Sequence, residues 1–372
     1  MQKKPYQGQI KIGELESIRG LAALLIIFFH TTATNPLIDI GIINNGYLMV
    51  ELFFVLSGFI IFNSYANEIN SSKELIRFQF LRLGRIYPLH LLFLLIFLTL
   101  ETIRYILGTK LGMLNSRALP FDKNNLDAFI QHVFLIQAIG PTGNALTFNG
   151  PAWSISVEFY TYLIFGVTIL LLKHMQTYIF GLIAIITLFM LVADFTYGFN
   201  DLLRCLSGFF IGCLTAISIK NIRKTIPSYL SLLTFTSILI FLQLKTTNDF
   251  DTLMYFLTAI LIVSLILSPN GPLNKFLTLR IFSWLGVISY SMYMSHTFIL
   301  YGIHIALKYL FQYPQQARGS DGIWLFVLSP TETIVMLSVY LFLVLIASQL
   351  TYIYIEKPLR IKSRLFATAK LS

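Results

Sequence analysis

Charged side chains are scarce in this chain, and cysteine is nearly absent. Only 12% of its 372 residues are Asp, Glu, Lys or Arg, whereas roughly a quarter of the residues in soluble proteins are charged. The two cysteines, Cys205 and Cys213, both fall inside one apolar segment, where thiols usually act as small buried hydrophobes. The low charge excludes an ordinary soluble domain, and the cysteines predict neither a disulfide partner nor a metal site.

Apolar residues make up most of the chain instead. Hydrophobic residues account for 56% of it and aromatic residues for 15%, and the mean hydropathy is +0.73. A segment of about twenty apolar residues can cross a hydrocarbon core roughly 30 Å thick. Ten such segments can be placed, at residues 17–34, 47–66, 86–107, 152–173, 176–195, 201–219, 227–245, 252–268, 283–307 and 332–355. The predicted fold class is therefore an all-α integral membrane protein, a bundle of about ten transmembrane helices that forms a single domain over residues 1–372.

Lysine and arginine predict the orientation of this bundle. If the N-terminus is cytoplasmic, nineteen of the 27 Lys and Arg residues fall on the inner side, as the positive-inside rule requires. We therefore expect both termini, including a tail at residues 356–372, to be cytoplasmic. The net charge of +10 then faces anionic membrane lipids rather than a nucleic acid.

Two segments need separate interpretation. Residues 18–29 follow several lysines, as the core of a signal peptide does, but the nine apolar segments after them favour a retained first span. The long connection at 108–151 contains a semi-apolar stretch at 129–136. This stretch is too short to span, so we expect it at the membrane interface or as a re-entrant loop.

His30 ends one of the most apolar runs of the chain, and Arg19 precedes it by eleven residues. That spacing is close to three helical turns, so both side chains project from nearly the same face, roughly 16 Å apart along the axis. Ionisable groups in a spanning helix are costly and usually face a polar cavity or take part in chemistry. His30 is therefore a candidate catalytic residue; the alternative is a hydrogen bond to a neighbouring helix.

Two arginines precede the third segment. Arg82 and Arg85 are three residues apart, just before Tyr87 and Pro88, so they lie on one side of a helical turn. Two guanidinium groups held together suit a ligand with several phosphates, because each presents a planar fork of donors. The alternative is an ordinary positive anchor at the inner membrane surface.

The fourth segment begins with Pro151 and carries a carboxylate. Ser154 and Glu158 are four residues apart and share a helix face. A carboxylate within an apolar span is expensive unless it is paired or protonated, so we predict that Glu158 either orients a histidine or binds a sugar hydroxyl. Trp153 offers a face on which a sugar ring could stack, although an interfacial position is common for tryptophan.

The ninth segment contains a polar stripe. Ser289, Tyr293 and His296 follow the four-then-three spacing of one helix face, and such a stripe must face protein or water. We expect these residues to bind or orient the substrate, with His296 supporting His30 rather than replacing it. The other histidines are expected to pack or to be solvated at the interface: His90, His132, His174 and His304.

Together these motifs resemble the membrane acyltransferase-3 family of bacterial integral-membrane carbohydrate O-acyltransferases. The resemblance runs from Glu14 to about Pro358. It rests on Arg19 with His30, Phe53-Phe-Val-Leu-Ser-Gly-Phe59, Arg82-Leu-Gly-Arg85-Ile-Tyr-Pro88, Trp153-Ser-Ile-Ser-Val-Glu158, Ser289-Tyr-Ser-Met-Tyr293 with His296, and Tyr354-Ile-Glu-Lys-Pro358. One departure is the pair Phe159 and Tyr160, because many members continue with more polar residues after the glutamate.

The resemblance implies a ten-helix bundle in the bacterial inner membrane that takes an acyl group, usually acetyl, from cytoplasmic acetyl-CoA to an extracytoplasmic carbohydrate. His30 matches the catalytic histidine of the family, and Arg82 and Arg85 match its paired arginines, which engage the nucleotide end of the donor. Arg19 and Tyr87 are expected to help hold the donor. Some relatives carry a further extracytoplasmic domain; since this chain stops at Ser372, we expect any second transfer step to use a separate protein.

Two questions stay open from the sequence. His30 could act as a general base, which typically contributes ~10²–10⁴-fold to a rate, or as a nucleophile that carries the acyl group. We favour the base, because the pKa of an unperturbed imidazole, about 6.5, suits proton transfer, and Glu158 or His296 could fix its tautomer. The rival function is a polysaccharide exporter or proton-coupled transporter, in which a histidine and a glutamate would relay protons.

Overall fold

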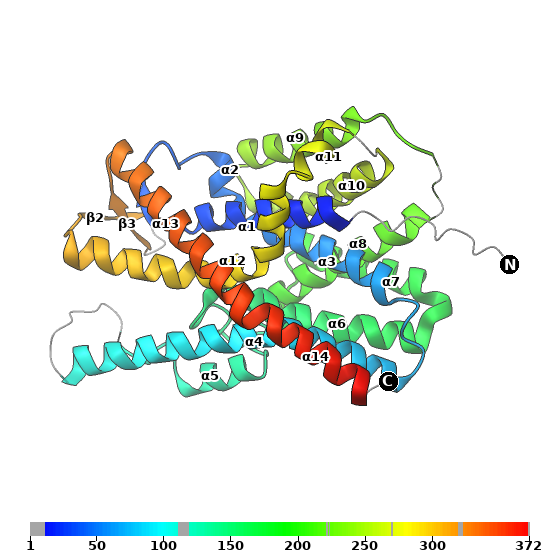
Figure 1. Cartoon of the computed structure of the whole chain (residues 1–372), viewed down its shortest axis with the longest axis horizontal. Coiled ribbons are helices and arrows are strands. Elements are labelled where there is room, and N and C mark those ends of the chain that lie inside the picture. Colours follow the sequence, from blue (N-terminus) through cyan, green and yellow to red (C-terminus); the bar gives the residue numbers. More distant parts are fainter. Residues whose placement is uncertain are drawn as a thin grey trace.

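The computed structural model describes residues 12–110, 119–220, 222, 224–268, 271–318 and 323–370. It is a bundle of helices whose long axes run in broadly the same direction (Figure 1). The long helices are α1 (Ile12–Phe29), α3 (Met49–Tyr65), α4 (Ser72–Tyr105), α6 (Trp153–Leu172), α7 (Gln176–Val192), α8 (Asn200–Lys220), α9 (Tyr229–Leu244), α10 (Leu253–Leu267), α12 (Arg280–Ile305) and α13 (Pro330–Thr351). The shorter helices are α2 (Gly41–Asn44), α5 (Leu126–Val133), α11 (Pro272–Leu277) and α14 (Lys357–Lys370).

Each of the ten predicted segments overlaps one of the long helices, which confirms the all-α class. Within the described residues, five helical stretches are long and apolar enough to cross a membrane: Gly46–Tyr65, Ser72–Gly108, Gly150–Val192, Asn200–Lys220 and Pro330–Ala369. That ten segments cross therefore stays a prediction. The two described ends of the chain, the start of α1 and the end of α14, lie at the same end of the bundle (Figure 1), as two termini on one membrane side require.

Helix α4 is longer than its hydropathy predicts. It begins at Ser72 rather than near residue 86, and the side chain of Ser71 caps it by accepting a hydrogen bond from the Glu74 amide. Such a cap satisfies an amide that would otherwise be unpaired at the helix start. The helix continues through Pro88, so Arg82 and Arg85 lie inside a long helix and not at its beginning.

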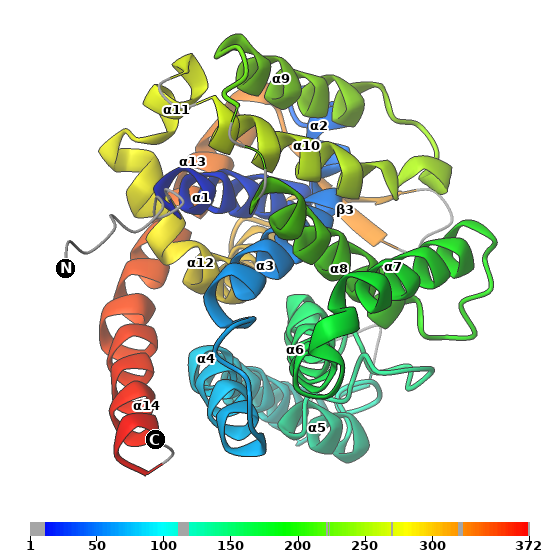
Figure 2. The same cartoon turned by 90° about the vertical axis from the view of Figure 1, so that its right-hand side faces the viewer.

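Seen along the bundle, the helices form three rough layers (Figure 2). Helices α4, α5 and α6 lie on one side, and α9 and α10 lie on the other, with α1, α3, α8 and α12 between them. Glycines allow close approaches in the middle layer: a Cβ on Gly58 would clash with the Phe209 carbonyl oxygen, and one on Gly286 would clash with that of Glu16. Small residues are typical of helix contacts in lipid, where backbones pack closely.

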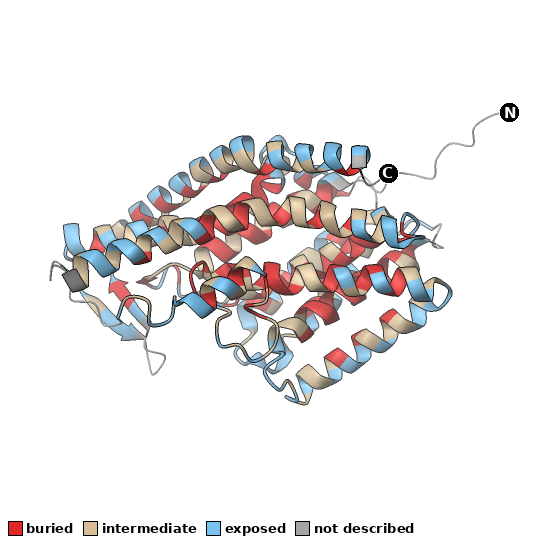
Figure 3. Cartoon of the chain, turned by 90° about the horizontal axis from the view of Figure 1, so that it is seen from below, coloured by how far each residue is buried: buried red, intermediate tan, exposed pale blue. Residues whose placement is uncertain are grey.

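The outward faces of the peripheral helices are exposed (Figure 3), and many of their exposed residues are large and apolar. On α7, Leu182, Ile185 and Phe189 are exposed, and on α13 the same holds for Val335 and Phe342. An exposed apolar surface of this extent marks contact with a membrane or a partner. We therefore treat the chain as a membrane protein.

A small sheet, which the sequence did not predict, follows the end of α1. It contains β1 (Ala33–Thr34), β2 (Gln315–Arg318) and β3 (Ile323–Val327) in the order β1-β3-β2. Strand β1 pairs in parallel with β3, and β2 pairs antiparallel with it. The Phe326 amide also donates to the Thr32 carbonyl at 2.8 Å. The sheet thus fixes the backbone immediately after His30 to the connection before α13.

The long connection between α4 and α6 packs through two histidines. His132 of α5 is buried, and its ring stacks on that of His90 in α4, with the centroids 5.8 Å apart. The His132 Nε2 lies 2.9 Å from the Thr147 hydroxyl, and the His90 Nε2 donates to the His132 carbonyl at 2.9 Å. These two side chains pack, as expected for them. The stretch predicted to be interfacial therefore folds over α4 as a short helix.

Acid is expected to destabilise this connection. Burial, with a smaller contribution from the His90 ring, lowers the pKa of His132 to about 3, whereas the pKa of an unfolded histidine is about 6.5. Between these values only the unfolded chain binds the proton, so the stability that His132 provides is present above pH 6.5 and is lost progressively as the pH falls toward 3. At pH 5 the loss would be about 2 kcal/mol.

Thermal unfolding of the detergent-solubilised protein at pH 7.5 and pH 5 would measure this effect. His132→Gln should unfold with a smaller difference between the two pH values than wild type. His174→Gln, at an exposed site, is the matched control and should keep the wild-type difference. An unchanged difference in the His132 variant would contradict the assignment.

Candidate active site

A small cavity lies between α1, α3, α6 and α12, and it brings together residues from four predicted spans. Its volume is about 50 Å³, room for a few water molecules. Its lining includes Arg19, Phe53, Phe54, Ser154, Glu158, Ser289, Tyr290 and Tyr293. Five of these were predicted as site residues from the sequence: Arg19, Ser154, Glu158, Ser289 and Tyr293. We call this the central cavity.

Glu158 is held by two hydroxyl groups at the central cavity. Its Oε1 accepts hydrogen bonds from the Ser57 hydroxyl at 2.6 Å and from the Tyr162 hydroxyl at 2.5 Å. Arg19 also lines the cavity, and its guanidinium carbon lies 5.9 Å from the Phe53 ring centroid. Its buried Nε has no hydrogen-bond partner in the described part of the chain. The cavity is therefore lined by a carboxylate held by hydrogen bonds and by a guanidinium group that has an unpaired hydrogen-bond donor.

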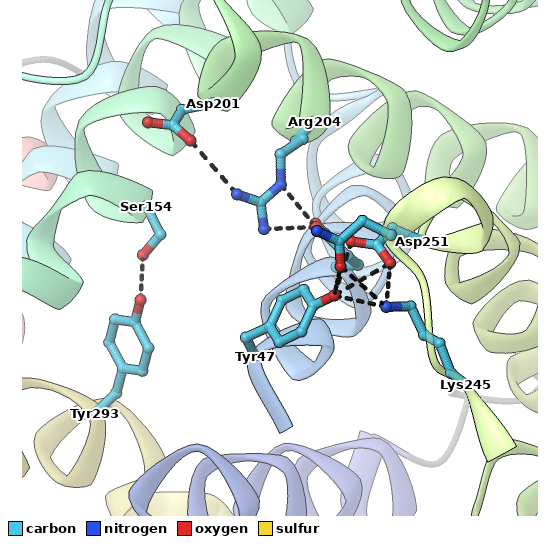
Figure 4. Close-up of polar contacts among 9 residues, drawn as sticks. Tyr47, Ser154, Asp201, Arg204, Lys245, Asp251 and Tyr293 are labelled. Atoms are coloured by element: carbon cyan, nitrogen blue, oxygen red, sulfur yellow. Dashed lines mark hydrogen bonds and ion pairs between the residues drawn. The ribbon is translucent and has the colours of Figure 1, made fainter. Parts of the chain in front are cut away.

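Hydroxyl groups line the wall nearest α12. The Ser154 and Tyr293 hydroxyls lie 2.9 Å apart (Figure 4), and that of Tyr293 also donates to the Pro151 carbonyl at 2.9 Å. The Ser289 hydroxyl donates to the Gly286 carbonyl of its own helix at 2.8 Å. These bonds fix the start of α6 against α12.

His30 lies at the end of α1 and faces His296 of α12. The two imidazole centroids are 4.9 Å apart, and His296 is fully buried. The Tyr293 ring, on the wall of the central cavity, lies 6.0 Å from that of His296. His30 therefore points into the bundle and not into lipid, and Tyr293 and His296 link it to the cavity.

A backbone carbonyl fixes the tautomer of each imidazole. The Nδ1 of His30 lies 2.9 Å from the Ile26 carbonyl, and that of His296 lies 3.3 Å from the Met292 carbonyl. A carbonyl can only accept, so each Nδ1 carries the hydrogen and each Nε2 presents a lone pair. The sequence suggested Glu158 or His296 as the orienting group for His30. The structure gives that role to Ile26, because Glu158 bonds Ser57 and Tyr162 instead.

The paired arginines lie on α4, as predicted. Arg82 is buried, its Nη2 donates to the Tyr65 hydroxyl at 2.8 Å, and its guanidinium carbon lies 4.8 Å from the Tyr65 ring centroid. Its Nε is buried without a partner among the residues that the structure describes. Arg85 is half-buried and lies within electrostatic range of both Arg82 and Arg19. A row of cations therefore leads from Arg82 toward the central cavity.

Tyr87 does not join this row. Its hydroxyl donates to the Val133 carbonyl at 3.0 Å and ties α4 to α5. Two residues along a helix correspond to a turn of about 200°, so Tyr87 lies on the face opposite Arg85. The structure therefore separates Tyr87 from the arginines with which the sequence grouped it.

A larger cleft opens at the opposite end of the bundle from the two described chain ends. Its volume is about 880 Å³, within the range of ligand sites. Its lining combines polar side chains with one tryptophan and includes Glu101, Arg104, Asp122, Lys123, Asn124, Asn144, Trp153, Asp201 and Arg204. Trp153 lines this cleft while the next residue, Ser154, lines the central cavity. The two spaces therefore adjoin at the start of α6, and we call the larger one the outer cleft.

Arg204 organises the inner wall of the outer cleft. Its guanidinium carbon lies 4.7 Å from a ring centroid of Trp153, and its nitrogens pair with Glu51 at 2.6 Å. They also pair with Asp201 at 3.4 Å (Figure 4). The sequence analysis did not select Glu51 or Arg204. Both are charged residues within predicted spans, so the rule that selected His30 and Glu158 applies to them equally.

Comparisons with known proteins identify the family of the chain. A family model for the acyltransferase domain of the acyltransferase-3 family matches residues 12–353, nearly the whole described chain. The chain belongs to the acyltransferase-3 family. Both the histidine-bearing end of α1 and the paired arginines of α4 lie inside the matched region.

Several relatives are 24% identical to the chain. YrhL of Bacillus subtilis (strain 168), whose name describes a peptidoglycan O-acetyltransferase, aligns over 93% of the chain and 54% of its own length. The O-acetyltransferase OatA of Staphylococcus aureus (strain NCTC 8325 / PS 47) aligns over 94% and 57%. The chain thus spans about half the length of these two relatives. ORF330 of Acidianus two-tailed virus, named as an acetyltransferase, aligns over 76% of the chain and 81% of its own length. No solved structure matches the chain.

Proposed function

We propose that this acyltransferase-3 protein moves an acyl group, in the first instance acetyl, from cytoplasmic acetyl-CoA to a hydroxyl of an extracytoplasmic carbohydrate. It does so in the bacterial cytoplasmic membrane, with both termini inside. The observation that carries the proposal is the continuity of three features: the Arg82 and Arg85 pair, the central cavity beside the His30 and His296 rings, and the outer cleft that adjoins the cavity at Trp153.

The arginines supply the contacts for an anionic donor. The buried Nε atoms of Arg19 and Arg82, which have no partner in the described ranges, fit a ligand that brings acceptor oxygens, because a buried unpaired donor is costly. Phosphates of the donor would pair with Arg82 and Arg85, and Arg19 would contact the donor nearer the reacting carbonyl. A bound thioester supplies the acyl group to be transferred.

His30 then acts on the acceptor hydroxyl. Its Nδ1–H donates to Ile26, which leaves Nε2 to take the proton as the hydroxyl oxygen attacks the acyl carbonyl. The new carbon–oxygen bond forms, the carbon–sulfur bond breaks, and the proton passes from His30 to the departing thiolate. His296 lies against His30, and Glu158, Ser154, Ser289 and Tyr293 offer hydrogen bonds to the acceptor or the acyl oxygen.

The outer cleft fits a carbohydrate acceptor. Amide, carboxylate and guanidinium groups around a tryptophan are the kinds of partner that sugar hydroxyls and an apolar sugar face require. A peptidoglycan-type glycan is the first acceptor to test, because YrhL carries that name.

Proteoliposomes test the proposed reaction directly. Given radiolabelled acetyl-CoA on one side and a glycan on the other, wild-type protein should produce base-labile ester on the glycan, detected by scintillation and by mass spectrometry. Vesicles without protein are the control. Movement of the glycan across the membrane without ester would overturn the proposal in favour of the transporter.

A further inference from the structure

A third space lies at the other end of the bundle, where the described chain begins and ends. It is about 630 Å³ in volume and is formed by the end of α3, the start of α4 and α14. Its lining includes Tyr65, Arg77, Phe78 and Arg364, with Glu68 and Glu74. We call it the inner cleft. The proposed function assigns nothing to it.

Helix α14 is held over this cleft by packing. Its Phe366 ring lies 5.3 Å from that of Phe80 on α4, and Gly84 of α4 leaves room for Ser363, since a Cβ there would lie 2.5 Å from that of Ser363. Figure 1 shows α14 crossing α4 obliquely. The arrangement brings Arg364 to the inner cleft.

The turn that aims α14 is a π-helix, η7 (Tyr352–Glu356), between α13 and α14. Its last residue, Glu356, is buried, and the Ser291 hydroxyl of α12 donates to its Oε2 at 2.8 Å. Single π turns within helices are rare and frequently mark functional sites. Here the π turn joins α13 to α14 and sets the path that α14 takes across α4.

The charges of the inner cleft suit a phosphate-bearing ligand. Arg77 and Arg364 come from two different helices, and the Nε of Arg77 is buried without a partner in the part of the chain that the structure describes. Of the two acids, Glu74 is already engaged: its Oε2 accepts from the Asn70 amide at 2.7 Å and from the Ser71 hydroxyl at 3.2 Å. Arg77 and Arg364 present two guanidinium forks to this cleft, against one lining acid, Glu68, that these hydrogen bonds do not engage.

The inner cleft also adjoins the paired arginines. Tyr65 lines it, and the Tyr65 hydroxyl accepts the hydrogen bond from Arg82. A ligand that fills the cleft therefore lies one side chain away from Arg82, and its far end can continue toward Arg85 and the central cavity. The volume is within the range of small-molecule sites, and Tyr65 with Phe78 forms an apolar wall for a purine ring.

We infer that the inner cleft binds the phosphoadenosine end of coenzyme A, with Arg77 and Arg364 holding its 3′-phosphate, while the diphosphate lies toward Arg82 and Arg85. This inference rests on the proposed function and assigns two donor-binding residues outside the Arg82 and Arg85 motif. Arg364 also gives α14 a role in donor binding. An anionic lipid headgroup offers the same phosphate chemistry, and the experiment separates the two sources.

Calorimetry on the full-length protein, purified in detergent without anionic lipid, tests the inference. Wild type, Arg77→Gln, Arg364→Gln and the double variant are titrated with coenzyme A and with dephospho-coenzyme A, which lacks the 3′-phosphate. Each substitution should weaken coenzyme A binding by roughly tenfold to a hundredfold, because a hydrogen bond to a charged group contributes about 1.5–3 kcal/mol. In the double variant, the preference for coenzyme A over its dephospho form should disappear.

Two controls accompany the titration. Lys362→Gln removes the same charge from an exposed site on α14 that does not line the cleft, and it should bind like wild type. Arg77→Lys keeps the charge without the planar fork and should recover part of the affinity. Size-exclusion chromatography of every variant establishes that it is folded.

The outcomes are distinct. If wild type binds coenzyme A and the double variant binds it equally well, the inner cleft is not the donor site, although the proposed function stands. If wild type neither binds coenzyme A nor acylates a glycan, the proposed function itself fails. If native mass spectrometry in phosphatidylglycerol nanodiscs shows lipid lost from the double variant while its coenzyme A affinity is unchanged, the cleft is a lipid site and the inference is overturned.

Discussion

Replacing His30 with alanine should lower the rate of acyl transfer by about 10²- to 10⁴-fold, the usual contribution of a general base. The reason is the position of its Nε2, which is free to accept a proton because Nδ1 is fixed by the Ile26 carbonyl. The fold should survive, since the helix retains its other contacts and His30 is only half-buried. Labelled acetyl transfer in proteoliposomes measures the rate, and size-exclusion chromatography measures folding.

His174→Ala is the matched control for that experiment. His174 is exposed in η4 (Lys173–Met175), after the end of α6, and does not line the central cavity, so its loss should leave the rate unchanged. His296→Ala should lower the rate less than His30→Ala, because it removes a neighbouring ring and not the proposed base. A His30 variant with the wild-type rate would eliminate His30 as the catalytic residue.

The same assay separates the two roles of His30. A general base forms no covalent link to the acyl group, so no labelled acyl-protein should accumulate when donor is supplied without acceptor. A nucleophile would retain label on the protein under those conditions. Acid quenching followed by gel electrophoresis and fluorography of wild type and His30→Ala makes the distinction.

The sequence predicted five residues of the central cavity because one physical rule selects all five. Arg19, Ser154, Glu158, Ser289 and Tyr293 are polar residues in apolar segments, and such residues must face protein or water. The polar side chains of four neighbouring helices that avoid lipid all point into the interior that these helices share. Residues selected one at a time by this rule therefore lie close together in the central cavity.

The partners of these residues could not be predicted in the same way. Which hydroxyls bind Glu158 depends on which helices adjoin, and neither Ser57 nor Tyr162 differs in sequence from other serines and tyrosines in apolar segments. Tyr87 shows the opposite problem: its closeness to Arg85 in sequence suggested a shared role, but a spacing of two places residues on opposite helix faces. The sequence did not predict that α4 begins at Ser72, because a hydropathy window detects only the apolar part of a helix and not a polar first part.

Neither the small sheet nor the outer cleft could be predicted from the periodicity of apolar residues in the sequence. Strand β1 has two residues and pairs with β3, almost three hundred positions away, so neither shows a pattern on its own. The outer cleft is built mainly from the connection between α4 and α6, whose conformation depends on contacts such as the stacking of His132 on His90. Irregular segments of this kind are specified by packing rather than by local preference.

Replacing Arg204 with methionine should destabilise the protein by about 3–5 kcal/mol, the cost of breaking a buried ion pair by removing one partner. Glu51 is 1% exposed, and its Oε2 already has no hydrogen-bond partner within the described residues. Without Arg204 its carboxylate would be left unpaired in the interior, and Trp153 would lose the guanidinium beside its ring.

Replacing the other partner of the ion pair, Glu51, should lower the free energy of unfolding by less. Glu51→Gln leaves Arg204 with its Asp201 contact at 3.4 Å and its position beside Trp153, so the remaining cation keeps favourable partners. The double variant, Glu51→Gln with Arg204→Met, should recover part of the stability lost in Arg204→Met, because no charge is then left unpaired. Asp201→Asn is the control and should cost less than about 1 kcal/mol, as expected for a long, partly exposed ion pair.

Unfolding in mixed micelles with increasing denaturing detergent gives these free energies of unfolding. The affinity of each folded variant for a glycan fragment measures separately whether the outer cleft still binds its ligand. If stability falls equally in Arg204→Met and in the double variant, the cost comes from lost packing against Trp153 and not from the isolated carboxylate. If glycan binding falls in Arg204→Met while Asp201→Asn retains it, the guanidinium beside the Trp153 ring contributes to acceptor binding as well as to the ion pair.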